Sequence, residues 1–436
     1  FCLSMMFYFR FLIAFILLHS TIQAQGPVII GYWQNWISSE APYIPLDQID
    51  GRYDIVCVSF AVLTSPADMN MQFVPESVSQ STFIQQMNTI QAQGKKVLLS
   101  IGGANTSISM PDQTSHDAFI NSMNSLLDTY PFDGIDIDIE HGNSILASGI
   151  ISNPTSVDCV YLIDAITQIK AHYAATHSNT MMLTFAPETA YVQGGMSAYG
   201  GIWGGYLPIL DALRDDINYI HVQLYNSGTV YGIDGEIYAQ GTADFIVAMT
   251  EAMIQGFSTS GGEFAGFPEE KIVVGLPACT AAAGGGFCSP VVVASAIDYL
   301  HGNGNAPGNY TLVHSQGYPQ LGGMMTWSIN WDAVSTCNAS PYEYVSNYEQ
   351  LFETILSTEE NGKEIKPVLF PNPANTFIHI SNLTDSDYQI SDITGKLIKA
   401  GKIDSNSTIE IDSLNDGFYW IYVNQSWIKF VKQSSN

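Results

Sequence analysis

The chain has 436 residues, 46% of them hydrophobic, which is enough apolar material for one large domain or two ordinary ones. Its 41 acidic and 14 basic residues give a formal net charge of −27, so nucleic acid and anionic membrane surfaces are poor partners. Charged residues make up only 13% of the chain and aromatic residues 12%, a balance that suits an uncharged ligand such as a neutral glycan.

The first 24 residues predict a secretory signal peptide. Arg10 precedes the apolar run 11–18, and small residues ending at Ala24 resemble a cleavage site. An apolar run this short is well below the ~20 residues that a membrane-spanning helix needs, so we expect export and no stable membrane span.

Charge also marks a domain boundary. Residues 25–362 carry 33 acidic and six basic side chains, whereas residues 363–436 carry eight acidic side chains and seven lysines. Such a shift is typical of a change of domain. We therefore expect a body at 25–356, a linker at 357–366 and a separate tail at 367–436.

The cysteines give no support for a metal or redox site, because the sequence has no CxxC and no HExxH. We expect neither a metal nor a cofactor. Cys279 and Cys288 flank a glycine-rich loop and could form a disulfide in an oxidising compartment. Cys57 lies in an apolar run, where a buried thiol is expected.

The body alternates short apolar runs with segments of helix length. Runs that are apolar throughout indicate strands buried on both faces, and helical crossovers between them indicate a parallel sheet. Eight such units predict a (β/α)8 barrel. A doubly wound sheet is disfavoured, because no GxGxxG follows the first strand and no GxxxxGK[ST] occurs. The predicted strands are 28–33, 54–62, 96–101, 134–139, 181–186, 218–224, 271–276 and 322–328.

The fourth predicted strand carries the strongest chemical signal. In Phe-Asp-Gly-Ile-Asp-Ile-Asp-Ile-Glu, residues 132–140, the isoleucines alternate with Asp136, Asp138 and Glu140. Because successive side chains of a strand point to opposite faces, the three carboxylates point into the barrel and the isoleucines toward the helices. Inward carboxylates are costly to bury, so this pattern predicts catalysis at the carboxyl end of the barrel.

The pattern Asp133-x-x-Asp136-x-Asp138-x-Glu140 resembles the DxxDxDxE signature of family 18 glycoside hydrolases, the chitinases. The resemblance extends over residues 27–355 and includes no visible insertion between strands seven and eight, which favours an open groove and endo cleavage. Three further motifs carry it: Ser100-Ile-Gly102-Gly103 is similar to SxGG, Gln223-Leu-Tyr225-Asn226 to QxYN, and Trp327 to the tryptophan that ends the last strand.

The resemblance implies hydrolysis of chitin or N-acetylglucosamine oligosaccharides, with retention and assisted by the substrate's acetamido group. Glu140 would be the general acid, Asp138 would hold the acetamide, Asp136 would share a proton with Asp138, Tyr225 would hold the acetamide oxygen, and Trp327 would support the sugar. Further expected substrate-binding residues are Trp33, Gln223, Asn226, Glu188 and Trp331, and expected structural residues are Asp133, Ser100, Gly102 and Gly103.

Two other functions share the motif. An endo-β-N-acetylglucosaminidase acting on glycoprotein glycans needs the same carboxylates, so substrate data are required to separate it from a chitinase. A chitin-binding lectin on a catalytically dead barrel usually lacks the acid, and Glu140 is present here.

The tail has short alternating runs split by Asn, Asp and Gly, which predict a small all-β, immunoglobulin-like sandwich. A carbohydrate-binding module with Trp420 and Trp427 as sugar platforms is one reading. The pieces at 370–374, 392–396 and 417–419, with Lys429-Phe-Val-Lys432, more closely resemble the C-terminal sorting domain of type IX secretion. That resemblance implies a Gram-negative bacterium, Sec export, passage across the outer membrane by the type IX machinery, and a secreted or cell-surface location.

Overall fold

A computed structural model gives the fold. The predicted signal peptide, 1–24, and the predicted linker, 357–366, lie outside the residues that the structure describes. The described residues are 26–65, 68–140, 145–335, 337, 340–349, 351, 367–381, 383, 386–392, 396–403, 407–424 and 426–434.

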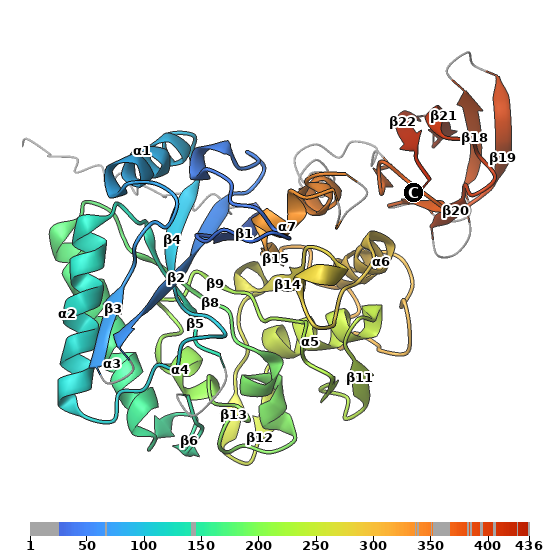
Figure 1. Cartoon of the computed structure of the whole chain (residues 1–436). Coiled ribbons are helices and arrows are strands. Elements are labelled where there is room, and N and C mark those ends of the chain that lie inside the picture. The colour runs from blue at the N-terminus through green and yellow to red at the C-terminus, as the bar shows by residue number, and fades with distance from the viewer. Residues whose placement is uncertain are drawn as a thin grey trace, which may run out of the picture.

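The body is a parallel β-barrel surrounded by helices, as the sequence predicts (Figure 1). Its eight strands, counted within the described residues, follow the order β14-β15-β1-β2-β4-β5-β8-β9. Single parallel bridges, Ile220 to Ile272 and Gln223 to Gly275, close the barrel between β9 and β14. The strands are β1 (Val28–Gln34), β2 (Ile55–Ser65), β4 (Lys96–Gly102), β5 (Gly134–Asp138), β8 (Met182–Phe185), β9 (Tyr219–Ile220), β14 (Val273–Pro277) and β15 (Gly323–Trp327).

The sixth predicted strand, 218–224, is shorter than expected, because beyond Ile220 the chain pairs with its neighbours through isolated bridges only. Helices cover the outside of the barrel, and the N-termini of α1, α2, α5 and α7 carry polar caps, as at Asp112, whose side chain accepts from the Ser115 backbone N–H. The helices are α1 (Gln80–Gln91), α2 (Gln113–Thr129), α3 (Val157–Thr176), α4 (Leu207–Ala212), α5 (Ala243–Gln255), α6 (Pro290–Leu300) and α7 (Ile329–Asp332).

Smaller elements decorate the loops. Strand β3 (Asp68–Gln72) pairs antiparallel with the end of β2 and extends the wall of the barrel mouth. Three short hairpins are β6 (Gly149–Ile150) with β7 (Asn153–Pro154), β10 (Thr229–Tyr231) with β11 (Ile237–Ala239), and β12 (Phe257–Thr259) with β13 (Gly262–Phe264). The 3-10 turns are η1 (Leu46–Gln48), η2 (Thr189–Tyr191), η3 (Gln193–Met196), η4 (Glu269–Lys271) and η5 (Thr280–Ala282).

Two apolar cores follow from the period-two pattern of the strands. The larger core lies between strands and helices, and it contains Ile135, Ile137 and Ile139 of β5 together with helix residues such as Phe119. The smaller core fills the barrel interior with residues such as Ile30 and Leu98. The carboxylates of β5 therefore point inward, as the alternation predicts.

The expected Cys279–Cys288 disulfide is wrong. Cys279 pairs instead with Cys337, which lies 58 residues further along the chain, at a Cα–Cα distance of 5.7 Å. This separation is within the usual range for a disulfide. Cys288 is a free, buried thiol, as is Cys57. The bond thus joins the chain after β14 to the chain after β15, two segments that the parallel pairing of these strands brings together.

The tail folds as two facing antiparallel sheets, in agreement with the predicted all-β unit. One sheet has the order β16-β17-β20 and the other β19-β18-β21-β22, and they enclose their own core, which includes Ile378, Ile390 and Phe430. His379 Nε2 lies 3.1 Å from Asp298 Oδ2 of α6, a polar contact between tail and barrel. The strands are β16 (Leu369–Phe370), β17 (Phe377–Ile380), β18 (Asp387–Asp392), β19 (Leu397–Lys402), β20 (Thr408–Glu410), β21 (Gly417–Val423) and β22 (Ser426–Lys432).

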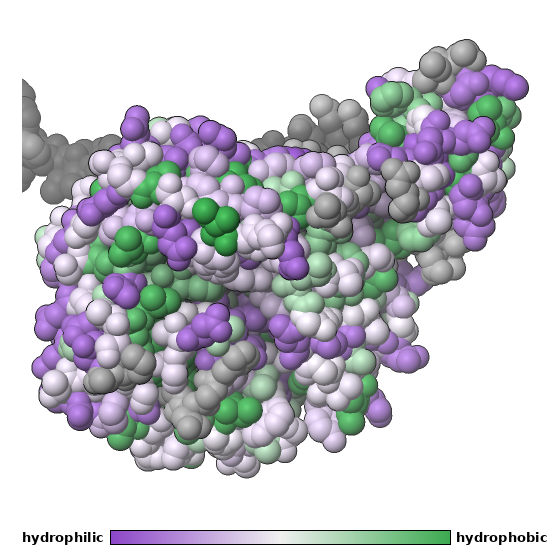
Figure 2. Space-filling model, viewed as in Figure 1, coloured by the Kyte–Doolittle hydropathy of each residue, from purple (hydrophilic) through white to green (hydrophobic). Residues whose placement is uncertain are grey.

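On the face of the molecule that Figure 2 shows, hydrophobic side chains are interspersed with hydrophilic ones over both barrel and tail. Among the described residues, no helix has the length and apolar character needed to cross a membrane.

Candidate active site

The three alternating carboxylates lie at increasing height along β5 and the residues after it. Asp136 is fully buried in the barrel, Asp138 is 2% exposed, and Glu140 is half-buried at the mouth. Burial of charge is tolerated only when each carboxylate has partners, so the contacts of each carboxylate indicate its protonation state.

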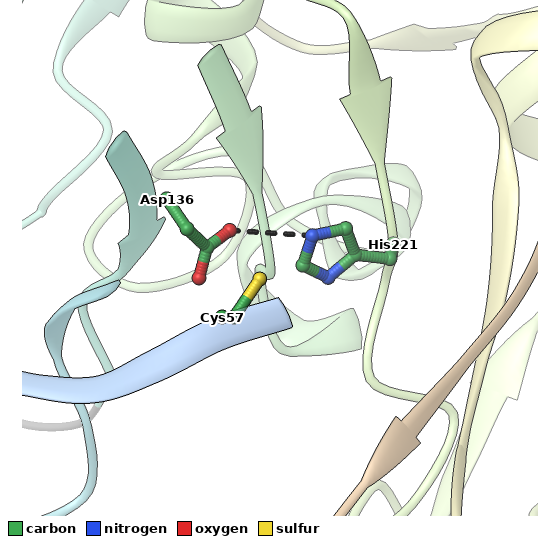
Figure 3. Close-up of side chains that lie close together, drawn as sticks. All are labelled: Cys57, Asp136 and His221. Carbon is green, nitrogen blue, oxygen red and sulfur yellow. Dashed lines mark ion pairs between the residues drawn. The ribbon is translucent and has the colours of Figure 1, made fainter. Parts of the chain in front are cut away.

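Asp136 is surrounded by donors from neighbouring strands. Its Oδ2 accepts from Tyr32 Oη at 2.6 Å and Ser100 Oγ at 2.7 Å, and its Oδ1 accepts from Thr184 Oγ1 at 2.7 Å. His221 Nε2 lies 3.2 Å from the same Oδ1 (Figure 3). Burial alone would raise the pKa of Asp136, but the contact with His221 and the other hydrogen bonds outweigh it and lower the pKa. Asp136 is therefore an ionised carboxylate.

Asp138 has the opposite electrostatics. Burial raises its pKa well above the usual range, and the charges of Glu140 and Asp136 and a hydrogen bond with Glu140 raise it further. Two hydrogen-bonded carboxyl groups cannot both ionise easily, so these interactions favour the protonated form of Asp138 beside Glu140. The expected sharing of a proton between Asp136 and Asp138 stays a prediction, and the oxygens of Asp136 already accept hydrogen bonds from Tyr32, Ser100 and Thr184.

Gln223 joins the two upper carboxylates. Its Nε2 lies 2.8 Å from Asp138 Oδ1, 2.9 Å from Glu140 Oε1 and 3.0 Å from the carbonyl oxygen of Ala186. One amide nitrogen therefore contacts both members of the hydrogen-bonded pair. Since an amide has two hydrogens for these three acceptors, at most two of the three contacts are hydrogen bonds at one time.

An open cleft lies above the carboxylates. Glu140, Gln223 and Asn226 line its deep part together with Tyr225 and Trp327. The cleft continues between the ends of β1, β2 and β4 as a second pocket of about 490 Å³, where Asn35, Gln72, Phe73 and Glu76 are among the lining residues. Residues shared by both parts are Trp36, Phe60, Ala104 and Asn105.

Aromatic rings form the apolar wall of the deep part. Trp327 stacks on Phe60 with ring centroids 5.9 Å apart and an angle of 11°, and it also contacts Trp36. Tyr225 is buried, and burial raises its pKa well above 10, as do the charges of Asp138 and Glu140. Its phenol group is therefore a neutral hydrogen-bonding group beside an apolar floor.

The two glycines of the Ser100-Ile-Gly-Gly segment allow the barrel wall to pass close to the carboxylate strand. A Cβ on Gly102 would lie 2.4 Å from the carbonyl oxygen of Asp138, and φ there is +114°. A Cβ on Gly103 would lie 2.6 Å from the Phe60 ring. The Gly103 backbone N–H also donates to the Asp138 carbonyl oxygen at 2.7 Å. Larger residues would therefore displace Asp138 or Phe60.

Two further predicted residues lie apart from the deep cleft. Asp133 is at the opposite end of β5, where it accepts from Lys96 Nζ at 2.9 Å and from the Val97 backbone N–H at 2.9 Å. Glu188 is half-buried and pairs with Gln223 through a backbone bridge, and its charge contributes to the raised pKa of Asp138.

Trp33 does not line the cleft, which corrects the sequence-based expectation. It is fully buried, packs against Tyr43 and Phe83, and donates from Nε1 to the carbonyl oxygen of Ile44 at 2.9 Å. The alternation along β1 turns Trp33 toward the helices and its neighbour Tyr32 into the barrel. Trp331, in α7, is half-buried and is not among the residues that line either part of the cleft.

Several site residues were missed at the sequence level: Tyr32, Phe60, Asn105, Thr184 and His221. Tyr32 could have been found, because the parity that places Ile30 inside the barrel also places Tyr32 there. The contacts of Thr184 and His221 with Asp136 depend on how the strands are staggered, which no local pattern reveals.

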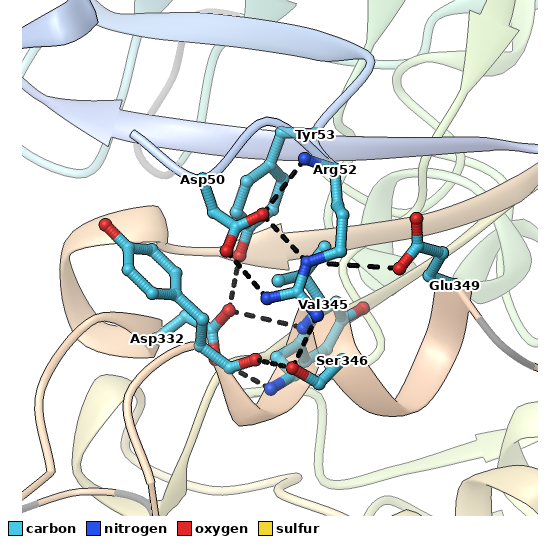
Figure 4. Close-up of polar contacts among 9 residues, drawn as sticks. Asp50, Arg52, Tyr53, Asp332, Val345, Ser346 and Glu349 are labelled. Carbon is cyan, nitrogen blue, oxygen red and sulfur yellow. Dashed lines mark hydrogen bonds and ion pairs between the residues drawn. The ribbon is translucent and has the colours of Figure 1, made fainter. Parts of the chain in front are cut away.

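A separate polar network supports the chain beyond β15 (Figure 4). The buried carboxylate of Asp332 accepts from Tyr53 Oη at 2.6 Å and from the Tyr344 backbone N–H at 2.7 Å. Arg52 pairs with Asp50 at 2.6 Å and donates to Ser346 Oγ at 2.7 Å. Burial raises the pKa of Asp332 to about 6, against the lowering effect of these hydrogen bonds.

Comparison with known proteins gives two matches along the chain. Residues 28–286 match the profile of glycosyl hydrolases family 18, and residues 368–434 match that of a secretion system C-terminal sorting domain. Chitinase Chi52 of Paenibacillus xylanexedens is 43% identical over 312 residues, or 70% of this chain and 59% of that protein. Chitinase D of Niallia circulans is 41% identical over 343 residues, or 77% and 63%. This chain thus spans about three fifths of the length of these relatives.

A solved structure shares the fold. A family GH18 chitinase from Chromobacterium violaceum superposes with a TM-score of 0.66 at 35% sequence identity, over 75% of this chain and 83% of that one.

Proposed function

Because the chain belongs to family 18 of the glycosyl hydrolases, we propose that its barrel hydrolyses the β-1,4 links between N-acetylglucosamine units of chitin, with retention of configuration. The observation that carries the proposal is the contact of Asp138, Glu140 and Gln223 at the barrel mouth, next to the aromatic wall of the cleft. Most retaining glycosidases use a second carboxylate as nucleophile, but this family uses the substrate instead.

In the first step, Glu140 gives the proton that it shares with Asp138 to the glycosidic oxygen. In the sugar whose glycosidic bond is cleaved, the acetamido carbonyl oxygen bonds to the anomeric carbon as the bond to the leaving group breaks, so an oxazolinium ion forms. Asp138 is then ionised, accepts the acetamide N–H and offsets the positive charge. Tyr225 holds the acetamide oxygen in line, and Trp327 supports the distorted sugar.

In the second step, water attacks the anomeric carbon on the face that the leaving group vacated. Glu140 takes a proton from that water, the oxazolinium ring opens to the acetamide, and the shared proton of the Asp138–Glu140 pair is restored. No step needs a metal or a cofactor. The two attacks occur one after the other on opposite faces of the anomeric carbon, which gives net retention of configuration.

Endo cleavage is supported by the openness of the groove. Between β14 and β15 every residue is described, and this stretch contains only the turn η5 and helix α6 as regular elements. No α+β insertion therefore builds a second wall over the cleft within these described residues. Bound sugars can extend from the deep part of the cleft into the second pocket.

For the tail we propose type IX sorting, on the basis of the matched profile at 368–434. The protein would leave a Gram-negative cell by Sec export followed by outer-membrane passage, and would act outside the cell or at its surface. The exposed Trp420 and Trp427 keep a sugar-binding alternative open to test.

The function is tested with Glu140→Gln, assayed on chitin oligomers and on a high-mannose glycoprotein. An amide cannot donate the proton, so turnover should fall by roughly 10²- to 10⁴-fold while oligomer binding persists. Glu263→Gln, on the β12–β13 hairpin and outside the cleft, is the matched control and should retain wild-type rates. Near-normal turnover by Glu140→Gln would disprove the mechanism, and cleavage of the glycoprotein alone would make the enzyme an endo-β-N-acetylglucosaminidase.

A further inference from the structure

His221 is a buried histidine with no assigned role. It follows β9 in the barrel interior, and its side chain is fully buried. Neither ring nitrogen makes a well-aligned hydrogen bond with a described residue, so burying the imidazole has a free-energy cost. The polar contact that offsets this cost is the one between Nε2 and Asp136 Oδ1 at 3.2 Å.

The groups around the imidazole come from three strands. Asp136 of β5 faces Nε2, the ring of Tyr32 from β1 packs edge-on at a centroid distance of 5.9 Å, and the Cys57 thiol of β2 lies within 4.8 Å of the polar atoms of Asp136 and His221. Figure 3 shows Asp136 and His221 pointing toward each other, with Cys57 beside them.

Cys57, Asp136 and His221 are close enough to hold a metal ion, but their chemistry does not suit one. Both oxygens of Asp136 already have donors at 2.6–3.2 Å. Burial, together with the charges of Asp136 and Asp138, raises the pKa of the Cys57 thiol well above its usual value, whereas a metal requires the thiolate. The cluster is therefore better explained by what it does for Asp136.

An ionised carboxylate offers about four acceptor positions. Tyr32, Ser100 and Thr184 occupy three of them, and the contact from His221 occupies the fourth. With these positions filled, Asp136 offers no acceptor for the proton of Asp138. That proton is directed instead toward Glu140, the partner with which Asp138 forms a hydrogen bond.

We propose that His221 is a positioning residue for hydrolysis, which completes the donor set of Asp136 and thereby keeps Asp138 turned toward Glu140. The inference rests on the proposed function. Without His221, Asp136 becomes an acceptor for Asp138, and the acetamide-binding group turns down into the barrel and away from the acid.

The test compares His221→Leu, which removes the donor, with His221→Gln, whose amide can donate from a similar position. Hydrogen bonds to charged groups contribute enough that kcat of His221→Leu should fall roughly 10- to 100-fold, with KM changed less than about threefold. The acid limb of its pH–kcat/KM profile should move about one unit toward higher pH, because the carboxylates lose a stabilising contact. His221→Gln should recover most of both changes.

Two controls separate positioning from packing. Cys57→Ala changes the same buried cluster without touching the donors of Asp136, and His301→Gln changes a buried histidine outside the barrel interior. Both should keep the wild-type pH profile, even where their melting temperature falls. Circular dichroism and thermal unfolding verify the fold of each variant.

The outcomes are distinct. A folded His221→Leu enzyme with wild-type kcat and pH profile would overturn the inference, as would a folded His221→Gln enzyme that recovers neither. If His221→Leu does not fold, the double variant His221→Gln/Thr184→Val takes its place. Thr184→Val removes another donor to Asp136 Oδ1, so the same acid-limb shift decides the question. Loss of wild-type activity to a chelator, with recovery on adding zinc, would make the cluster a metal site. If the wild type hydrolyses no chitin oligomer, the proposed function itself has failed.

Discussion

Replacing Gln223 with methionine tests how the proton-sharing pair is held. Methionine has a similar length and shape but no N–H groups, so Gln223→Met removes the contacts of 2.8 Å to Asp138 and 2.9 Å to Glu140 without opening a large cavity. The backbone bridge that links residue 223 to Gly275 does not depend on the side chain.

The expected loss follows from these two contacts. A hydrogen bond to a charged group contributes about 1.5–3 kcal/mol, and the amide can satisfy two of its three acceptors at once. Losing about 3 kcal/mol of transition-state stabilisation lowers kcat/KM roughly 100-fold. Because the amide favours the ionised forms of Asp138 and Glu140, its removal should also raise the apparent pKa of this pair. The acid limb of the pH–kcat/KM profile should then move toward higher pH.

Initial rates on chitin oligomers between pH 4 and 9 measure both effects, with thermal unfolding as a check on the fold. Gln193→Met is the matched control, since Gln193 is a fully buried amide that donates to the Met249 carbonyl oxygen away from the cleft. The control should lose stability without a change of profile. A Gln223→Met enzyme within about threefold of the wild type, with an unshifted acid limb, would refute the assigned role of Gln223.

Two further predictions concern stability and delivery. Burial raises the pKa of Asp332 from 3.8 to about 6, so the folded state binds this proton more tightly; its stabilising effect is complete below about pH 4 and is lost as pH rises through 6, about 3 kcal/mol in all. The free energy of unfolding, measured with urea from pH 4 to 8, should therefore fall more steeply with pH for the wild type than for Asp332→Asn. Parallel curves for the two proteins would contradict the raised pKa. A chain ending at Leu356 should cleave soluble chitin oligomers at the full-length rate but accumulate in the periplasm of the native host; normal export, with activity lost only on crystalline chitin, would identify the tail as a binding module.

The alternation in residues 134–140 is enough to predict the catalytic strand. A strand has period two whatever surrounds it, so Asp136, Asp138 and Glu140 had to share a face opposite the isoleucines. Short apolar runs predicted the eight barrel strands, whose bounds in the structure differ from the predicted ones by a few residues. The prediction for Trp33 was wrong because the face of β1 was assigned from the residue type rather than from the parity of Ile30 and Tyr32.

The contacts between residues of different strands could not be predicted from the sequence. Cys279 was expected to pair with a cysteine nine positions away, yet its partner is Cys337, because the parallel pairing of β14 with β15 brings the ends of these strands together. The pairing of β5, β8 and β9 likewise places Gln223 against Asp138 and Glu140, and sets His221 against Asp136. Side-chain direction along one strand is a local property of the backbone, whereas the height at which two strands meet depends on the stagger of the whole sheet, and so only the folded barrel determines which carboxylate holds the proton.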